Sequence, residues 1–337
     1  MSATATREPL NRKDFVSDQE VRWCPGCGDY AILAQTQRLL PDLGVPRENI
    51  VFISGIGCSS RFPYYLNTYG FHSIHGRAAT FASGLKITRP ELLVFVITGD
   101  GDGLSIGGNH LIHALRRNMD LNIILFNNRV YGLTKGQYSP TSEVGKRTVS
   151  SPDGSLEQPV SPARIALAAE ASFVARTVAT DTKHLSATLE RAAHHRGGCF
   201  VEVYQNCNVY NDGAFDYFAE RSVRAEQTIN LEHGKPLVFG KSRDKGIKLD
   251  GLTPVICAAD DPDLLVHNEK IPSNVLPYVL AHMSPAAGVP LPLGVLRAVD
   301  KPTYEDGMAE QIEAARERQG EGDVAALLRA GDTWTVG

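Results

Sequence analysis

The stretch ELLVFVITGDGDGLSIGGNHLIHALRRNMDLNIILFNN, residues 91–128, decides the fold class. It holds two apolar, β-branched runs at residues 91–98 and 121–128, separated by a glycine-rich turn and a segment with helical spacing. Near-continuous apolar strands are typical of parallel sheets that helices cover on both faces, and a strand, a helix and a strand of this length form a βαβ unit. The sequence therefore predicts an α/β fold with a mostly parallel sheet and helices on both faces.

The same alternation continues on both sides of this unit. A further strand is expected at residues 49–54, before the turn GIGCSS, and helices are expected at residues 161–172 and 182–195, before a strand at 197–207. After about residue 212 the pattern changes to candidate hairpins, a proline-rich PLPLG and a charged helical run. We therefore predict an N-terminal arm (1–22), an α/β domain (23–212) and an irregular C-terminal extension (213–337). The extension is expected to pack on the core or on a partner subunit.

Composition excludes several classes of function. The chain has 337 residues, 42% of them hydrophobic, and a formal net charge of −4, so it has no basic field for nucleic acid or an anionic membrane. Its apolar runs are too short to span a bilayer, and its first twenty residues lack the apolar segment of a secretory signal. Six cysteines in a chain of this length are too few for a disulfide scaffold. We expect a cytoplasmic protein that binds neither nucleic acid nor membranes.

Polar residues follow two neighbouring strands where each strand ends. Asp100 comes after the first strand and Asn128 after the second, so both face the crevice where open α/β sheets bind ligands. Magnesium prefers oxygen ligands and often shares its coordination shell with phosphates. Asp100, Asn128 and the carbonyl of Val130 can supply three of those ligands. Backbone N–H groups of Gly101 and Asp102, at the start of a helix, can hold a diphosphate.

Two common phosphate-binding motifs do not fit this chain. The dinucleotide pattern G-x-G-x-x-G fails because Leu104 or Ile106 stands where the third glycine is required. The Walker pattern fails at GKRT, residues 145–148, because no Ser or Thr directly follows Lys146. A glycine-rich turn without any ligand remains an alternative for GDG alone, but the Asn-Asn pair after the next strand favours a magnesium-diphosphate site.

The stretch WCPGCG, residues 23–28, raises a second question. Cys24 and Cys27 are separated by two residues, a spacing found in redox dithiols, zinc sites and iron–sulfur sites. A zinc ribbon typically has a second close pair, which this sequence lacks, and a thioredoxin-like pair would directly follow a strand. From these residues alone the alternatives stay open.

The order of several motifs resembles one family. GDGDGLSIGGNHLIHALRRN and NNRVYGLTKGQYSPTS, preceded by WCPGCGDYAIL, GIGCSSR and HGRA, resemble the beta subunits of 2-oxoacid:ferredoxin oxidoreductases, which bind thiamine diphosphate. The resemblance spans about residues 23–210. It implies CoA-dependent oxidative decarboxylation of a 2-oxoacid, with electrons leaving through an iron–sulfur cluster to ferredoxin.

The resemblance also implies which residues hold the cofactors. A [4Fe-4S] cluster is expected on Cys24, Cys27, Cys58 and Cys207, in agreement with the preference of such clusters for thiolates. Cys199 is interpreted as a buried apolar residue, and Cys257 is not assigned to the site. The implied contacts to thiamine diphosphate are Ile56, Gly57, Cys58, Ser59, His75, Gly76, Gly132 and Leu133.

Two basic residues are candidates for contact with substrate. The planar fork of Arg61 suits a 2-oxoacid carboxylate or a CoA phosphate, although a surface salt bridge is an equal alternative. Lys135 lies in a segment that resembles the mobile active-site loop of the family, and the alternative is a solvated lysine.

The resemblance is greatest to short bacterial enzymes that act on 2-oxoglutarate. It implies succinyl-CoA and CO2 as products, with pyruvate or another 2-oxoacid, or a non-redox thiamine reaction, as alternatives. The chain shows one diphosphate-type domain only, so an alpha subunit is expected to supply the pyrimidine-binding domain. We expect a dimer of alpha-beta heterodimers that carries thiamine diphosphate, Mg²⁺ and one [4Fe-4S] cluster, with CoA and ferredoxin as reaction partners.

Overall fold

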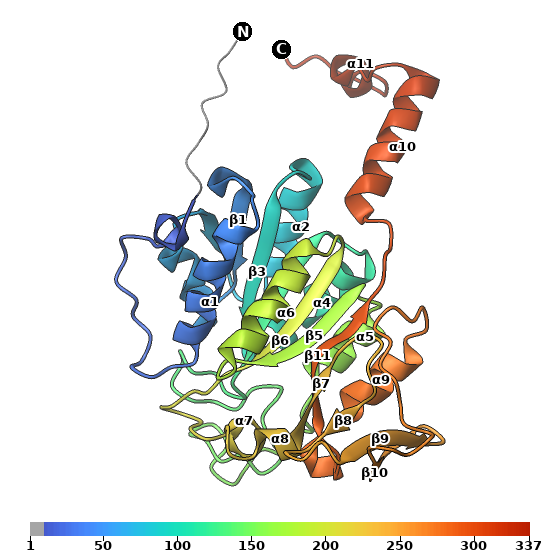
Figure 1. Cartoon of the computed structure of the whole chain (residues 1–337). Coiled ribbons are helices and arrows are strands. Elements are labelled where there is room, and N and C mark those ends of the chain that lie inside the picture. The colour runs from blue at the N-terminus through green and yellow to red at the C-terminus, as the bar shows by residue number, and fades with distance from the viewer. Residues whose placement is uncertain (1–9) are drawn as a thin grey trace.

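An eight-stranded sheet forms the centre of the computed structural model, which describes residues 10–337 (Figure 1). Its strand order is β2-β1-β3-β4-β6-β5-β11-β7. The strands are β1 (Ile50–Ser54), β2 (Tyr69–His72), β3 (Leu93–Gly99), β4 (Leu121–Asn127), β5 (Phe173–Val178), β6 (Gly198–Tyr204), β7 (Thr228–Leu231) and β11 (Leu291–Ala298). Only the pairing of β11 with β5 is antiparallel. The predicted α/β class with a mostly parallel sheet is confirmed.

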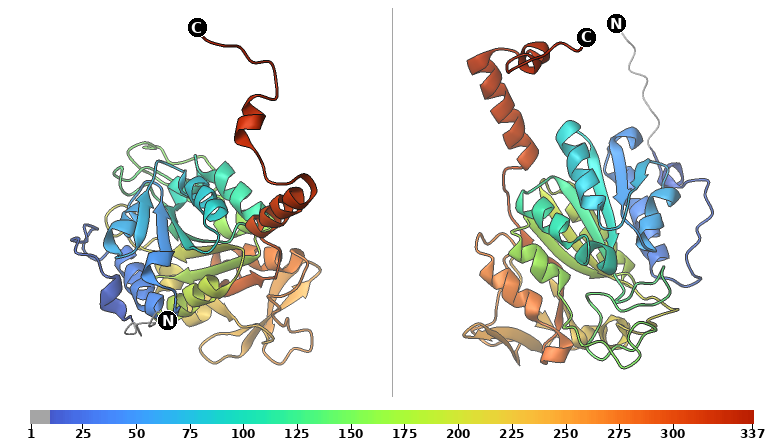
Figure 2. Two further views of the ribbon diagram at one scale, coloured as in Figure 1. Left: turned by 90° about the horizontal axis from the view of Figure 1, so that it is seen from above. Right: turned by 180° about the vertical axis from the view of Figure 1, so that it is seen from behind.

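Helices cover both faces of this sheet (Figures 1 and 2). One face carries α1 (Asp29–Asp42) and α6 (Thr182–His194). The other carries α2 (Ala78–Thr88), α4 (Gly108–Arg116), α5 (Pro162–Ala168) and α9 (Val275–His282). Every residue of the central strands β4 and β6 is buried, because these strands are covered on both sides. This burial explains why their sequences are almost continuously apolar.

Most of the elements expected between residues 49 and 207 are present with shifted ends. Strand β2 was not predicted, and two further regions differ from the sequence prediction. The GDGDG turn is itself a short helix, α3 (Asp100–Leu104), separated by a bend from α4. The run FVARTV forms the buried strand β5, which the sequence analysis left between two helices without an assignment. An arginine in an apolar run obscured this strand, and the structure pairs that residue, Arg176, with a buried carboxylate.

The region after residue 212 is more regular than an irregular extension. Strands β7 and β11 join the central sheet, and a three-stranded antiparallel sheet lies beside it, made of β8 (Val238–Phe239), β9 (Lys245–Asp250) and β10 (Thr253–Ala258). β11 begins within the proline-rich PLPLG, at Leu291, and Pro292 is accommodated within this strand. Pairing with β5 brings this distant segment into the hydrophobic core, through Leu293, Val295 and Leu296.

The last two helices stand away from this body. Figures 1 and 2 show α10 (Tyr304–Gln319) projecting beyond the edge of the sheet, with α11 (Val324–Leu328) at its end. The base of α10 is fixed where the Asp120 backbone N–H donates to Glu305 and Arg196 pairs with Asp306. Beyond it, Leu327, Leu328 and Trp334 are each more than 70% exposed. A projecting segment with exposed apolar side chains favours contact with another chain.

Short helical segments complete the architecture. They are η1 (Arg12–Phe15), η2 (Arg47–Asn49), η3 (Ser59–Tyr65), η4 (Pro285–Ala287), α7 (Asp216–Ala219) and α8 (Arg224–Gln227). Residues 1–9 of the predicted N-terminal arm lie outside the described residues. Among residues 10–337, no helix combines the length and the apolar character that crossing a bilayer requires.

Candidate functional site

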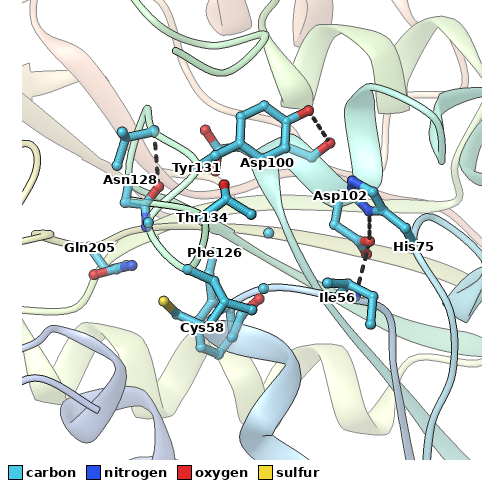
Figure 3. A pocket seen from close by; sticks show the side chains of 17 residues that line it. Ile56, Cys58, His75, Asp100, Asp102, Phe126, Asn128, Tyr131, Thr134 and Gln205 are labelled. Atoms are coloured by element: carbon cyan, nitrogen blue, oxygen red, sulfur yellow. Dashed lines mark hydrogen bonds and ion pairs between the residues drawn. The ribbon is translucent and has the colours of Figure 1, made fainter. Parts of the chain in front are cut away.

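The carboxyl ends of β1, β3, β4 and β6 surround a cavity of about 100 Å³ (Figure 3). Most of the residues that the sequence analysis assigned to the cofactor line it: Ile56, Gly57, Cys58, Ser59, His75, Asp100, Gly101, Asp102, Asn128, Val130, Gly132 and Leu133. Gly76 does not line it and instead supports its wall. Tyr131, Thr134, Phe126, Gly99 and Gln205 also line the cavity and were not predicted. We call this space the cofactor pocket.

Asp100 directly follows the carboxyl end of β3 and is the first residue of α3. Its side chain is buried, and one carboxylate oxygen accepts hydrogen bonds from Ser139 Oγ at 2.5 Å and Thr141 Oγ1 at 2.6 Å. Burial raises the pKa of Asp100, while these two hydroxyl groups lower it. The sequence analysis did not predict Ser139 and Thr141 as partners of Asp100, because they lie in a loop, 39 and 41 positions further along the chain. The only sequence signal was the run SPTS, whose hydroxyl groups can form polar contacts.

Asp102 organises the loops around the pocket with its side chain. Its Oδ1 accepts from the backbone N–H of Ile56 at 3.0 Å and of Gly76 at 2.7 Å, and it lies 2.6 Å from His75 Nδ1. Its Oδ2 accepts from Thr98 Oγ1 at 2.7 Å. One buried carboxylate therefore joins the turn after β1 to the loop before α2, a role that sequence reasoning did not assign.

Gly101 permits a close approach that no larger residue would allow. A Cβ placed on Gly101 would lie 2.3 Å from the ring of Tyr131, whose hydroxyl donates to the Gly101 carbonyl at 3.0 Å. The pocket wall is therefore built by an aromatic ring lying directly on the backbone of α3.

The two asparagines of the Asn-Asn pair face different ways. Asn128 lines the cofactor pocket, and its Oδ1 accepts from the Val130 backbone N–H at 3.1 Å. The Asn127 side chain instead bonds buried Glu202 at 2.8 Å. The chain turns between Asn128 and Val130 through Arg129, which has a left-handed φ of 56°. This turn brings the side chain of Asn128 and residue Val130 to the same pocket as Asp100.

Two buried polar atoms in the pocket lack partners. Ser59 Oγ and Gln205 Oε1 have no hydrogen bond within the part of the chain that the structure describes. Gln205 directly follows β6, just as Asn128 directly follows β4. This position at the end of a further strand is the sequence signal that could have identified Gln205 as a pocket residue. Buried polar groups are usually satisfied. These two atoms therefore fit a polar ligand in the pocket, and the oxygen donors Asp100 and Asn128 fit a magnesium ion beside it.

A second cavity, of about 240 Å³, adjoins the first and is lined by Cys24, Cys27, Cys58 and Cys207. We call it the cysteine cavity. It shares Cys58, Asn128, Gly132, Leu133 and Gln205 with the cofactor pocket. A Cβ on Gly132 would lie 3.4 Å from Cys58 Sγ and 3.8 Å from Cys207 Sγ. The absence of a side chain at Gly132 therefore leaves room for the sulfur atoms of Cys58 and Cys207 beside the wall that the two cavities share.

Hydrogen bonds bring three distant segments together at the cysteine cavity. Trp23 Nε1 donates to the Cys58 carbonyl at 2.7 Å, which fixes the WCPGCG segment to the turn after β1. The Gly28 backbone N–H donates to the Asn206 carbonyl, and Asn208 Nδ2 donates to the Pro25 carbonyl. The segment that contains Cys207 is therefore held against the loop of Cys24 and Cys27.

The environment of two of these cysteines, Cys27 and Cys58, raises the pKa of the thiol and so favours its neutral form in the protein alone. Burial raises the pKa of Cys58 to about 12, with the charge of Asp29 as the next cause. Burial and then Asp29 also raise the pKa of Cys27. Asp29, fully buried at the start of α1, was missed by the sequence analysis, and burial raises its own pKa to about 7. All four cysteines are free thiols, and among residues 10–337 no group of three or more His, Cys, Asp or Glu side chains is arranged around a single metal ion.

The two basic residues that the sequence suggested for substrate contact, and the two cysteines not assigned to the cluster, do not line the cofactor pocket. Arg61 and Lys135 line the cysteine cavity, and Arg61 Nη1 donates to the Arg22 carbonyl at 3.2 Å. Lys135 has a left-handed φ of 77°. Cys199 is fully buried within β6, as predicted, and Cys257 lies on β10, outside the cysteine cavity.

The rim of the cofactor pocket is apolar and exposed. Ile74, next to His75, is 65% exposed, and Ile106, which contacts Gly76, is 52% exposed. Leu133 lines the pocket and is also exposed. Exposed apolar side chains gathered beside a pocket are typical of a surface that a partner covers.

A mostly parallel sheet with a pocket at the carboxyl ends of its strands is the arrangement in which open α/β domains bind ligands. Residues 55–203 match the family model of the thiamine pyrophosphate enzyme C-terminal TPP binding domain. The 2-oxoglutarate oxidoreductase subunit KorB of Mycobacterium tuberculosis is 51% identical over 336 residues, which are 98% of this chain and 90% of that protein. The beta subunit of a 2-oxoacid:ferredoxin oxidoreductase from Saccharolobus solfataricus is 42% identical, over 61% of this chain and 68% of that protein.

A solved structure shows the same fold over nearly the whole chain. The 2-oxoglutarate:ferredoxin oxidoreductase from Magnetococcus marinus with 2-oxoglutarate, coenzyme A and succinyl-CoA bound has a TM-score of 0.77 and 30% sequence identity. The similarity covers 97% of this chain and 98% of that chain. The chain belongs to the family of 2-oxoacid:ferredoxin oxidoreductase beta subunits, and the resemblance noted in the sequence is confirmed.

Proposed function

We propose that this beta subunit oxidises 2-oxoglutarate to succinyl-CoA and CO2 and passes the electrons through a [4Fe-4S] cluster to ferredoxin. The substrate is supported by the names of the relatives from M. tuberculosis and M. marinus. For each 2-oxoglutarate consumed with CoA, the carbon–carbon bond to the carboxylate breaks and a thioester forms. Two electrons and one proton leave, and two ferredoxin molecules each accept one electron.

The turn that contains Cys58 carries this proposal. Cys58 lines the cofactor pocket and the cysteine cavity alike, so a donor in one space and an acceptor in the other would be separated by a single turn of chain. Bound thiamine diphosphate supplies the chemistry that cleaves a bond next to a carbonyl group, and the protein positions it. The oxidation releases two electrons, and each ferredoxin accepts only one. An acceptor of single electrons beside the cofactor pocket suits this reaction.

In this proposal the cofactor pocket holds magnesium and a diphosphate. Asp100, Asn128 and the Val130 carbonyl supply oxygen ligands to Mg²⁺, and the backbone N–H groups of Gly101 and Asp102 face the diphosphate. The unpartnered atoms Ser59 Oγ and Gln205 Oε1 gain partners from the cofactor. The remaining contacts are those that the family resemblance implies: Ile56, Gly57, Cys58, His75, Gly76, Gly132 and Leu133.

The cysteine cavity holds the cluster in this proposal, on Cys24, Cys27, Cys58 and Cys207. Four iron and four sulfide atoms need a space between the ligands, and all four cysteines line one cavity. Binding requires thiolates, so assembly of the cluster releases the protons that burial holds on Cys27 and Cys58. Arg61 and Lys135, on the wall of the same cavity, are proposed to contact the carboxylate of the substrate or the phosphates of CoA.

The pocket is expected to be completed by an alpha subunit. The exposed apolar rim formed by Ile74, Ile106 and Leu133 supports a partner that covers the cofactor pocket and supplies the pyrimidine-binding domain. We further propose a dimer of alpha-beta heterodimers in the cytoplasm, in which the chain after residue 213 contacts the core and the partner. The projecting helices α10 and α11 are the segment best exposed for this contact.

The test is to co-express the chain with its alpha subunit, purify the complex without oxygen, and measure metal content and activity. We expect iron with acid-labile sulfide, bound thiamine diphosphate, and CoA-dependent reduction of an artificial acceptor that is fastest with 2-oxoglutarate. Stoichiometric zinc without iron would refute the cluster. A clear preference for pyruvate would refute the substrate assignment while leaving the reaction class intact.

A further inference from the structure

A third cavity, of about 230 Å³, lies on the other side of β4 from the cysteine cavity and has no role in the proposed reaction. Its walls include residues of β4, β5 and β6, of the start of α5, of α7, and of the end of α9 with the residues that follow it. The two asparagines of the Asn-Asn pair divide the two sites, because Asn128 lines the cofactor pocket and Asn127 lines this cavity. We call it the arginine cavity.

The lining of the arginine cavity is cationic. Three guanidinium groups line it, those of Arg129, Arg164 and Arg176, against one carboxylate, that of Glu202. Arg129 is also paired with Glu143 and lies over the ring of Phe215, so part of its charge is compensated outside the cavity. The charge that remains within the cavity is positive and comes from arginine, whose planar fork binds carboxylate and phosphate groups with two hydrogen bonds.

Arg176 is the buried centre of this arrangement. It is 3% exposed; its Nε donates to Glu202 Oε2 at 3.1 Å, and its Nη2 donates to Ser161 Oγ at 3.0 Å and to the Ala281 carbonyl at 3.1 Å. Its Nη1 is buried and has no hydrogen-bond partner among residues 10–337. A buried guanidinium nitrogen without an acceptor is unfavourable, and its residue lines a cavity large enough to hold one.

The existing carboxylate does not satisfy this donor. Glu202 is fully buried, and its other oxygen already accepts from Asn127 Nδ2 at 2.8 Å. His282 does not add a fixed charge, because burial, followed by Arg164 and Arg176, lowers its pKa. Arg164 Nη1 lies 3.2 Å from His282 Nδ1, so a neutral ring can accept a hydrogen bond and hold Arg164 at the cavity wall.

We propose that the arginine cavity binds a small oxyanion, a carboxylate or phosphate group, with Arg176 as the buried contact and Arg164 as the contact nearer to solvent. The site is separate from the cofactor pocket but lies close to it. Thr141 Oγ1 lies 3.1 Å from Asn127 Oδ1 and 2.6 Å from Asp100 Oδ2, and its one proton can be donated to either oxygen but not to both at once. Asn127, which donates to Glu202, and the carboxylate proposed to bind magnesium therefore share Thr141 as alternative acceptors.

The test measures binding rather than turnover, so it gives a result whether or not the complex oxidises 2-oxoglutarate. The complex with its alpha subunit is saturated with thiamine diphosphate and Mg²⁺, which fills the cofactor pocket, and is titrated calorimetrically with succinate or with inorganic phosphate. Sodium chloride at matched ionic strength is the reference. Arg164→Gln removes a partly exposed charge without unpairing Glu202, whereas Arg38→Gln removes an exposed arginine of α1 far from the cavity and serves as the matched control.

We expect saturable binding of at least one of the two anions, weakened at least tenfold by Arg164→Gln and unchanged by Arg38→Gln. Stronger binding of succinate identifies a carboxylate ligand, and stronger binding of phosphate identifies a phosphate ligand; either supports the site. Arg176→Gln is expected to abolish binding, with its melting temperature measured in parallel because it leaves Glu202 unpaired. Equal affinity in wild type and Arg164→Gln, or no binding beyond the chloride reference, would overturn the proposal.

Discussion

Replacing Asp102 with alanine should lower the free energy of unfolding, because its carboxylate joins two loops of the cofactor pocket. The Asp102 carboxylate accepts the backbone N–H groups of Ile56 and Gly76, contacts His75 Nδ1 and accepts the Thr98 hydroxyl. In Asp102→Ala these donors lose their acceptor within the protein. A buried donor left unsatisfied costs about 1–3 kcal/mol, so the two backbone groups alone predict a loss of about 2–6 kcal/mol in the free energy of unfolding.

Asp102→Asn is the matched control for this prediction. Its amide oxygen can keep the bonds from Ile56 and Gly76, and its NH2 group can donate to the hydroxyl of Thr98, which also accepts hydrogen bonds. Only the strengthening due to charge is lost, and hydrogen bonds to ionised groups are roughly twice as strong as neutral ones. The loss in Asp102→Asn should therefore be about half of that in Asp102→Ala or less.

Urea unfolding, followed by tryptophan fluorescence, measures both losses. Trp23 reports on the relevant region because it donates to the Cys58 carbonyl in the turn that Asp102 holds. With a slope of about 3 kcal/mol per molar urea, the loss in Asp102→Ala corresponds to a midpoint lower by about 0.7–2 M. Equal midpoints for wild type and Asp102→Ala would refute the role of Asp102 as the residue that joins the two loops.

Further predictions concern the ligands and the projecting helices. Cys207→Ser should lower the iron content of the anaerobically purified complex, while Cys257→Ser, outside the cysteine cavity, should leave it unchanged; equal iron in both would argue against Cys207 as a ligand. Asp100→Asn should weaken binding of magnesium and thiamine diphosphate about 10- to 100-fold or more by calorimetry, since loss of a group that only supports a metal ligand already costs about 10- to 100-fold in metal affinity. Gln205→Met should weaken cofactor binding with little change in melting temperature, because Gln205 Oε1 has no partner in the described chain; unchanged affinity would contradict this. Removal of residues 320–337 should reduce association with the alpha subunit in size-exclusion chromatography without lowering the melting temperature of the chain, and full assembly would contradict a role in that contact.

The sequence predicted the fold where local patterns are strong. Residues 91–128 became β3, α3, α4 and β4 because apolar strands, glycines and helical spacing all indicate the same arrangement. β5 and β11 were missed because Arg176 and the prolines of PLPLG break the pattern expected of a strand. Pairing between residues more than one hundred positions apart stabilises these two strands, and no local pattern contains that information.

The site shows the same division between local and long-range information. Asp100 and Asn128 were found because parallel strands bring their carboxyl ends to one edge of the sheet. Ser139, Thr141, Gln205 and Asp29 were not found, because their contacts depend on how loops return to the sheet. The side-chain role of Asp102 was also missed, since a motif identifies which residues occupy a turn but not which loops a carboxylate will join.

The central claim is that electrons move from the cofactor pocket to the cysteine cavity past Cys58. The most direct test mixes the anaerobic, oxidised complex with 2-oxoglutarate and CoA in the absence of ferredoxin and follows the cluster by electron paramagnetic resonance. We expect a reduced [4Fe-4S] signal that requires 2-oxoglutarate and is lost in Cys58→Ala. Release of CO2 from 2-oxoglutarate without any reduction of a cluster in the wild-type complex would contradict it.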